Sequence, residues 1–500
     1  MSGPDRQAPI EVEAEEFRRL GHGLVDEIAD FLDALPERRV APGETPHEVR
    51  AALGGGGLPE HGTPADELLA ETTRLLFEHS TFNGHPRFLA YITSSAAPIG
   101  ALGDLLAATV NPNVGGWDLS PLASEVEAQT IRWIAELIGY PADCGGLLVS
   151  GGNMANFIGF LAARRARAPF NVRTEGMAAC DEGPLRVYGS DETHTWIHKA
   201  ADLFGLGTDA IRWIDTDDDQ RMLMPALREA IAEDRAAGAI PLLVVGAAGS
   251  VSTGAIDPLD EIAAVCRQEG IWFHVDGAYG APAAVLPEAS PQLKALALAD
   301  SVAIDPHKWL YAPLEAGCAL VRAPQALLDT FTYRPPYYAF HEGEDAPISY
   351  FDYGPQNSRG FRALKVWLGL RQVGREGYVR MISDDIELAK DLQRLASEEP
   401  ELEAWTTSLS VTTFRYVPAD VEPGDPEAEA YLNTLNREIR DRIEHGGEAY
   451  ISNAVVGDTY LLRACVVNFR TTAADIAALP EIVKRVGAEA HADQNPLRAA

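Results

Sequence analysis

The stretch IWFHVDGAY, residues 271–279, carries the pattern that decides the fold: an apolar run that stops at an acid and a glycine. Short apolar runs bounded by turn-forming residues are typical of buried strands. Six further runs share this pattern: GLLVS (146–150), RVYGS (186–190), IRWID (211–215), LLVVGAAG (242–249), SVAID (301–305) and CALVR (318–322). Helical segments separate most of them, so we expect an α/β fold with a mainly parallel seven-stranded sheet and helices on both faces.

The regions on either side of these runs have other patterns and suggest two further parts of the chain. Apolar residues recur at helical spacing over residues 15–35, and a second helix is expected over about 64–79. We expect residues 1–95 to form a helical segment that contributes to a dimer interface, because these helices have few local partners. Residues 96–385 then form the large domain. Residues 386–500 form a small α+β domain, with a helix, the strand SVTTFRY, a helix near 427–445 and the strand LLRACVVNFR.

Composition and charge exclude several classes of protein. Lys and Arg number 41 and Asp and Glu number 74, so the net charge is 41 − 74 = −33. Such an acidic chain repels nucleic acid and anionic membranes, and we expect neither as a partner. The five cysteines have no CxxC spacing, and no metal site is expected. The N-terminus lacks the features of a signal peptide and no apolar stretch reaches roughly 18 residues, so we expect a cytoplasmic protein.

Polar residues follow several of the expected strands at the point where each strand ends. In an open parallel sheet, ligands bind outside the carboxyl ends of the strands. The sequence Gly151-Gly152-Asn153 follows the first strand and leads into a helix. Small residues at a helix N-terminus let backbone N–H groups approach an anion, so this turn is a candidate phosphate cradle. A tight strand-to-helix turn is the alternative.

Three further side chains complete a constellation at the same edge. His194 follows the second strand, Asp276 ends the strand of IWFHVD, and Lys308 follows SVAID between an imidazole and an indole. A buried acid needs a cationic partner such as a protonated pyridine, and a desolvated lysine suits Schiff-base chemistry. Taken singly, these residues have ordinary alternatives: a structural histidine, a helix cap or ion pair, and a solvated lysine. Together with the glycine turn, they indicate pyridoxal phosphate (PLP) as the cofactor.

At these residues the chain resembles the group II PLP-dependent amino-acid decarboxylases, the aromatic-L-amino-acid decarboxylase family, of fold type I. The resemblance covers most of the chain. Its motifs are EEFRRLGHGLVDEIADF (15–31), HPRFLAYI (85–92), NPNVGGWDLSP (111–121), HVDGAY (274–279), DPHKW (305–309) and SRGFRALKVW (358–367). The pair HVDGAY and DPHKW is the most specific of these.

The resemblance implies roles for individual residues around the cofactor. Lys308 is the Schiff-base lysine, His194 stacks on the cofactor ring, Asp276 pairs with the ring nitrogen, and Ala278 packs on the other face of the ring. The remaining cofactor-binding residues are expected to be Gly152, Asn153, Asp305, His307 and, from the partner subunit, Ser358. Asn153 stands where relatives have Ser or Thr, Asp305 where Asn is usual, and Val251 where many have Thr.

Substrate contacts also follow from the resemblance. A loop tyrosine that enters the neighbouring active site corresponds to Tyr337, with Tyr338 as the alternative. The substrate pocket is expected to contain Tyr91, Ile92, Gly115 and Gly116, and the two glycines suggest a wider pocket. The shared active site implies a homodimer.

The expected activity is PLP-dependent decarboxylation of an L-amino acid to its amine and CO2. An aromatic substrate is favoured: tyrosine, DOPA, phenylalanine, tryptophan or 5-hydroxytryptophan. The alternatives on the same scaffold are an aromatic aldehyde synthase and a decarboxylase of a non-aromatic amino acid. A non-catalytic dimer of this fold and a metal hydrolase are the alternatives from other classes. The hydrolase is disfavoured because His194 and His198 occur without an HExxH arrangement.

Overall fold

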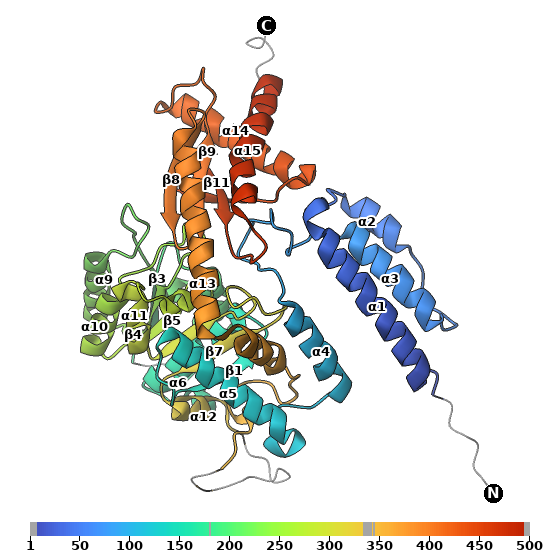
Figure 1. Ribbon diagram of the computed structural model, residues 1–500. Helices are drawn as coiled ribbons and strands as arrows, with labels where there is room; N and C mark the ends of the chain where they lie inside the picture. Colours follow the sequence, from blue (N-terminus) through green and yellow to red (C-terminus); the bar gives the residue numbers. More distant parts are fainter. Residues whose placement is uncertain (1–7, 180–181, 334–342, 344–345, 495–500) are drawn as a thin grey trace, which may run out of the picture.

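The computed structural model describes residues 8–179, 182–333, 343 and 346–494 (Figure 1). Its large lobe contains a seven-stranded sheet with the strand order β1-β7-β6-β5-β4-β2-β3. The strands are β1 (Gly145–Val149), β2 (Leu185–Ser190), β3 (Ile211–Ile214), β4 (Ile240–Ala247), β5 (Trp272–Asp276), β6 (Ser301–Ile304) and β7 (Gly317–Val321). All seven coincide with the predicted apolar runs.

Strand β7 is antiparallel to both of its neighbours, whereas β2 to β6 pair in parallel. Because β1 and β6 both run opposite to β7, β1 points in the same direction as the parallel strands. The prediction of a mainly parallel sheet is therefore confirmed. The carboxyl ends of β1, β2, β4, β5 and β6 lie at one edge of the sheet, where the predicted polar residues follow them.

Helices cover both faces of this sheet. Every residue of β1 and β7 is buried, which requires neighbours above and below the strand. The helices of this lobe are α5 (Pro121–Ile138), α6 (Gly152–Arg167), α7 (Val172–Glu175), α8 (Trp196–Leu203), α9 (Met224–Ala236), α10 (Leu259–Glu269), α11 (Pro291–Lys294) and α12 (Pro324–Phe331). The continuous hydrophobic core beneath them fixes the positions of the strand ends.

The C-terminal lobe is a four-stranded antiparallel sheet in the order β10-β11-β9-β8, with helices packed against it. Its elements are β8 (Leu402–Ser408), β9 (Val411–Tyr416), α14 (Pro426–Gly446), β10 (Ser452–Val456), β11 (Thr459–Cys465) and α15 (Ala473–Gln494). Strands β9 and β11 were predicted, but β8, β10 and α15 were not. The long helix α13 (Ala363–Glu398) runs from the large sheet to this lobe (Figure 1).

The N-terminal segment forms three helices beside the main body: α1 (Ala14–Ala34), α2 (Pro46–Leu53) and α3 (Ala65–His79) (Figure 1). The first and third were predicted. The Pro- and Gly-rich connection between them also contains α2, which begins with a capping box between Thr45 and Glu48. None of the three helices has a buried residue in the single chain.

Helix α4 (Pro98–Val110) follows the N-terminal segment and exposes a row of apolar side chains: Leu102, Leu105, Leu106 and Val110. None of the helices in the described part of the chain combines the length and apolar character that a membrane span requires.

Candidate active site

A cavity of about 320 Å³ lies at the carboxyl edge of the large sheet. The loops after β1, β2, β4, β5 and β6 all contribute to its wall. The lining residues are Ile92, Ser150, Gly151, Gly152, Asn153, Asn156, Glu192, Thr193, His194, Ala247, Gly249, Ser250, Val251, Asp276, Ala278, Tyr279, Asp305, His307, Lys308 and Leu314. The structure thus brings together the predicted phosphate cradle, imidazole, acid and lysine.

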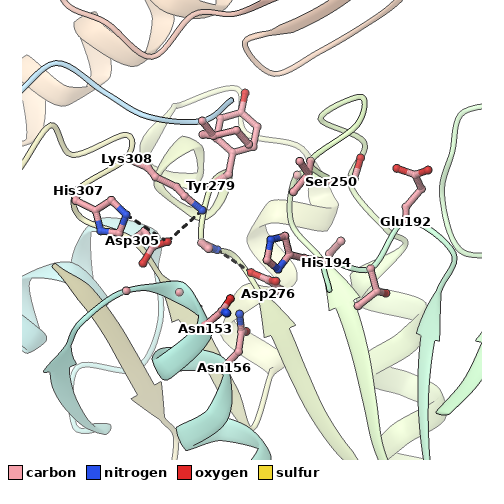
Figure 2. Close-up of a pocket in the computed structure, with 18 of the residues that line it drawn as sticks. Asn153, Asn156, Glu192, His194, Ser250, Asp276, Tyr279, Asp305, His307 and Lys308 are labelled. Carbon is pink, nitrogen blue, oxygen red and sulfur yellow. Dashed lines mark hydrogen bonds and ion pairs between the residues drawn. The ribbon is translucent and has the colours of Figure 1, made fainter. Parts of the chain in front are cut away.

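Lys308 reaches this cavity from a turn that follows β6. The backbone N–H of Lys308 donates to the carbonyl of Asp305 at 2.8 Å, which closes the turn. Its Nζ forms an ion pair with Asp305 Oδ2 at 3.1 Å (Figure 2). Asp305 is buried, and its Oδ1 has no hydrogen-bond partner among the described residues. The amine is therefore held beside an anionic group at the cavity wall.

His307 lies on the other side of the same carboxylate, with its Nε2 at 3.8 Å from Asp305 Oδ2 (Figure 2). The Nδ1 of its ring lies 2.7 Å from the carbonyl oxygen of Ala316. The backbone N–H of Ala316 also lies 3.3 Å from this Nδ1, so the ring is held by both backbone groups of Ala316. Ser94 also donates to the His307 carbonyl at 2.8 Å, so both ring and backbone are fixed.

Asp276 ends β5 and points into the cavity. Trp196 Nε1–H donates to Asp276 Oδ2 at 2.8 Å, and the backbone N–H of Ala278 donates to Oδ1 at 3.2 Å. Two donors stabilise the ionised carboxylate, which then has lone pairs left for a cationic group in the cavity. The Trp196 contact was not predicted, because Trp196 lies 80 positions from Asp276 in the chain.

His194 lies next to Asp276 (Figure 2). Burial lowers the pKa of this imidazole, Lys308 and Lys199 lower it further, and Asp276 opposes the shift. The ring is therefore neutral near pH 7. Its Nδ1 accepts the backbone N–H of Trp196 at 3.3 Å, which leaves the ring proton on Nε2. A flat, neutral imidazole of this kind can stack on an aromatic ring.

The glycine turn after β1 forms the opposite end of the cavity. Gly151 is the N-cap of α6 with a φ of 138°, and no side chain caps the first turn of this helix. A Cβ at Gly152 would lie 2.7 Å from Asp305 Oδ2 and 3.3 Å from the Ala278 Cβ. A side chain here would thus collide with Asp305 and Ala278, so the turn requires glycine. The N–H groups and the helix dipole at the start of α6 favour an anion.

Six polar lining residues were not predicted, among them Asn156 and Glu192. Asn156 uses its Oδ1 to accept from His274 Nε2 at 2.7 Å, so it braces the sheet beneath the cavity. Burial lowers the pKa of His274 to about 4, which keeps that imidazole neutral. Glu192 lies beyond His194 (Figure 2), and burial raises the pKa of its carboxyl. Its Oε2 has no hydrogen-bond partner in the described part of the chain.

Several predicted site residues lie outside this cavity in the single chain. Ile92 lines it, but Tyr91 is 54% exposed and does not. Gly115 packs on the backbone of Asn357, whose carbonyl oxygen an added Cβ would overlap, and Gly116 packs on Phe351. Ser358 is exposed. Tyr337 and Tyr338 lie outside the described residues.

The groups around the cavity match what PLP requires. The lysine amine can bind its aldehyde, Asp276 can neutralise its ring nitrogen, His194 can cover its ring, and the glycine turn can receive its phosphate. These four groups lie at the ends of different strands or in the loops that follow them, and all line one cavity; the lysine, acid and imidazole are shown in Figure 2.

Comparison with known proteins agrees with this geometry. A family model, the pyridoxal-dependent decarboxylase conserved domain, matches residues 46–417. An aromatic-L-amino-acid decarboxylase of Bacillus atrophaeus is 33% identical over 96% of this chain and 97% of its own. A phenylacetaldehyde synthase of a Rosa hybrid cultivar is 28% identical, over 91% of this chain and 90% of its own. A crystal structure of Oryza sativa TDC with PLP and tryptamine superposes with a TM-score of 0.88 at 27% identity, covering 97% of this chain and 99% of that one.

Fold and cavity thus define a PLP-dependent enzyme. Within that class, the chain belongs to the pyridoxal-dependent decarboxylase family, and its reaction is the decarboxylation of an amino acid.

Proposed function

We propose that this decarboxylase converts an aromatic L-amino acid to its amine and CO2. The observation that carries the proposal is the charge of the cavity wall. Among its described lining residues, Lys308 is the sole Lys or Arg side chain, and Glu192 adds a further acid. A substrate with an acidic side chain would meet no fixed cation there. Apolar residues, including Ile92, Val251 and Leu314, favour an uncharged aromatic side chain instead.

The Bacillus atrophaeus relative is an aromatic-L-amino-acid decarboxylase, which supports the same substrate class for this chain. We assign the residues of the cavity as follows. Lys308 binds the aldehyde of the cofactor covalently, and Asp276 holds a proton at the ring nitrogen. His194 stays neutral and orients the ring from one face, while Ala278 packs on the other. Gly152, Asn153 and the turn that carries His307 hold the phosphate.

When bound, PLP supplies an electron sink for the pair of electrons that remains after the Cα–carboxylate bond breaks. The protein must then deliver a proton to Cα. We assign this proton to the hydroxyl of Tyr337, a general-acid role typically worth roughly 10²–10⁴ in rate. Tyr338 is the alternative donor.

The aldehyde synthase is the second candidate function, because the Rosa relative with 28% identity is a phenylacetaldehyde synthase. The tyrosine at position 337 favours the decarboxylase. The two products separate these functions directly.

The active sites are proposed to be shared within a homodimer. Helices α1 and α3 expose apolar residues such as Phe17 and Leu68, and α4 exposes its row of apolar side chains. Faces of this kind are usually covered by a partner. In the dimer, the partner subunit would supply Ser358, the loop with Tyr337, and the segment of Gly115 and Gly116 to the neighbouring cavity.

Sharing can be tested by mixing two variants that each form little amine, Lys308→Ala and Tyr337→Phe, with amine formation as the activity that is measured. A mixed dimer has one site with both substitutions and one with neither. Random pairing should therefore restore activity at about a quarter of the sites. No restoration after mixing and refolding would contradict the shared site.

The function itself is tested with purified protein, PLP and a panel of L-amino acids, with product identification by mass spectrometry. We expect an aromatic amine and CO2, and no product from Lys308→Ala. Formation of aldehyde, ammonia and peroxide in equal amounts would establish the synthase instead. An amine from glutamate or another acidic amino acid would overturn the argument from the cavity charge.

A further inference from the structure

The three residues that follow Lys308 are each held by the long helix α13. Trp309 Nε1–H donates to Asp385 Oδ2 at 2.8 Å. The Tyr311 hydroxyl donates to the same oxygen at 2.6 Å. Between them, the carbonyl of Leu310 accepts the hydroxyl of Tyr378 at 3.2 Å. Every residue of the segment 309–311 thus has a direct hydrogen bond to one helix.

Asp385 is an unusual residue to find at this position. It is 3% exposed, and burial raises the pKa of its carboxyl to about 7, although Tyr311 and Trp309 partly oppose the shift. Among the described residues it forms no ion pair. A buried carboxyl without a cation is costly, so a purely structural position would favour an apolar residue. Among the described residues, both of its side-chain hydrogen bonds go to the segment that follows Lys308.

The backbone of this segment also needs support. The backbone of Tyr311 has a φ of 56°, a left-handed conformation that residues other than glycine seldom adopt. Its hydroxyl bond to Asp385 and the bond of its carbonyl to the N–H of Ala97 hold it there. Without them, the turn would be free to relax toward an ordinary conformation.

Trp309 connects this arrangement to the cavity. Its indole stacks on the ring of Tyr279, with centroids 4.9 Å apart and planes at 17°. Tyr279 lines the cavity, and its hydroxyl lies 2.7 Å from Ser410 Oγ in the C-terminal lobe. A movement of Trp309 would therefore change both the lysine turn and the cavity wall.

We propose that Asp385 and Tyr378 are positioning residues that fix the Lys308 amine at the cofactor. They lie seven residues apart, two helical turns, and so share one face of α13. Neither lines the cavity, and each acts through the 309–311 segment. The inference rests on the proposed cofactor role of Lys308, and the experiment below separates the two.

The test uses gentle substitutions that each remove one hydroxyl: Tyr311→Phe and Tyr378→Phe. The matched control is Tyr188→Phe, which removes another buried tyrosine hydroxyl bonded to a carboxylate, Asp234, at 2.8 Å, away from the cavity. The holoenzyme is prepared for each variant. Cofactor affinity is measured from the visible absorbance as PLP is titrated, and the pH titration of the bound chromophore is recorded.

Each Phe variant at the segment should weaken PLP binding about three- to tenfold and shift the pH midpoint of the chromophore. Tyr188→Phe should do neither. Asp385→Asn keeps the acceptor oxygen and should stay near wild type, whereas Asp385→Ala should lose affinity more strongly. If Asp385→Ala does not fold, the two Phe variants decide the result.

The inference is overturned if Tyr311→Phe and Tyr378→Phe match Tyr188→Phe in both affinity and chromophore titration. Lys308→Ala is measured in parallel. A chromophore that survives Lys308→Ala would refute the cofactor role of the lysine, whereas loss of the chromophore there with unchanged Phe variants would refute only the positioning role.

Discussion

Substitution of Gly152 by alanine should lower the affinity for PLP more than it lowers the stability of the fold. Gly152 is the first residue of α6, and alanine favours a helix over glycine by at most about 1 kcal/mol. The new Cβ would lie 2.7 Å from Asp305 Oδ2, closer than such atoms normally approach. Asp305 must then move, and its 3.1 Å contact with the Lys308 amine moves with it.

Overpacking of this kind costs about 1–3 kcal/mol. The clash is with Asp305 and Ala278 of the chain itself, so the apoprotein bears part of this cost, and PLP binding loses the rest because the displaced Asp305 shifts the Lys308 amine. This corresponds to roughly a tenfold or larger increase in the PLP dissociation constant. The apoprotein should melt within a few degrees of wild type, since the gain in helix propensity offsets the strain.

The assay is titration of the apoprotein with PLP, followed by visible absorbance, together with thermal melting. Gly446→Ala is the matched control, because it lies in a helix of the C-terminal lobe and its added Cβ would meet no atom within 4 Å. An unchanged PLP affinity in Gly152→Ala would show that the cofactor phosphate does not bind at this turn. A fully unfolded variant would contradict the estimate of the strain.

Three further outcomes are expected. Asp276→Ala should lower activity by roughly 10²–10⁴, because loss of one partner of a buried ion pair costs about 3–5 kcal/mol; wild-type kcat would refute its role at the ring nitrogen. Tyr337→Phe should turn the product from amine toward aldehyde, as measured by mass spectrometry. The carboxyl of Asp385 has its pKa raised from 3.8 to about 7 by burial, so the folded state binds the extra proton. Wild type should therefore lose stability relative to Asp385→Asn as pH rises from 4 to 7, by at most about 1.4 kcal/mol per pH unit in urea unfolding, and parallel curves would contradict this.

The large sheet was predictable because most of its strands are buried on both faces and thus read as continuous apolar runs, although the edge strand β3 exposes Trp213. Two site residues could be predicted for the same reason. Asp276 and Lys308 are polar residues at or just after the end of such a run. In the C-terminal lobe, β10 alternates buried and exposed residues over a short stretch, and this weaker pattern was missed. Helix α2 was missed because it has only eight residues within a Pro- and Gly-rich connection.

Contacts between distant segments could not be predicted in this way. The indole of Trp196 gave no sign that it would bond to Asp276, since nothing in a sequence specifies where a tryptophan N–H points. Gly115 illustrates the opposite difficulty. Its lack of a side chain suggested room for a substrate, whereas the structure shows a close approach of backbone to Asn357 that itself requires glycine.

The position of the lysine depends on both lobes of the molecule. Lys308 belongs to a turn of the large sheet, but the helix that holds this turn continues into the C-terminal lobe, where the Ala389 carbonyl accepts the hydroxyl of Thr412 from β9 at 2.7 Å. Asp385 lies only one helical turn before that contact. Substitutions at the junction of α13 and β9 should consequently lower the affinity for PLP more than equally distant substitutions in the N-terminal helices. Among the described residues, the N-terminal helices form no hydrogen bond to the 309–311 segment. These contacts would couple the position of the Lys308 amine to a lobe that supplies none of the described residues of the cavity wall.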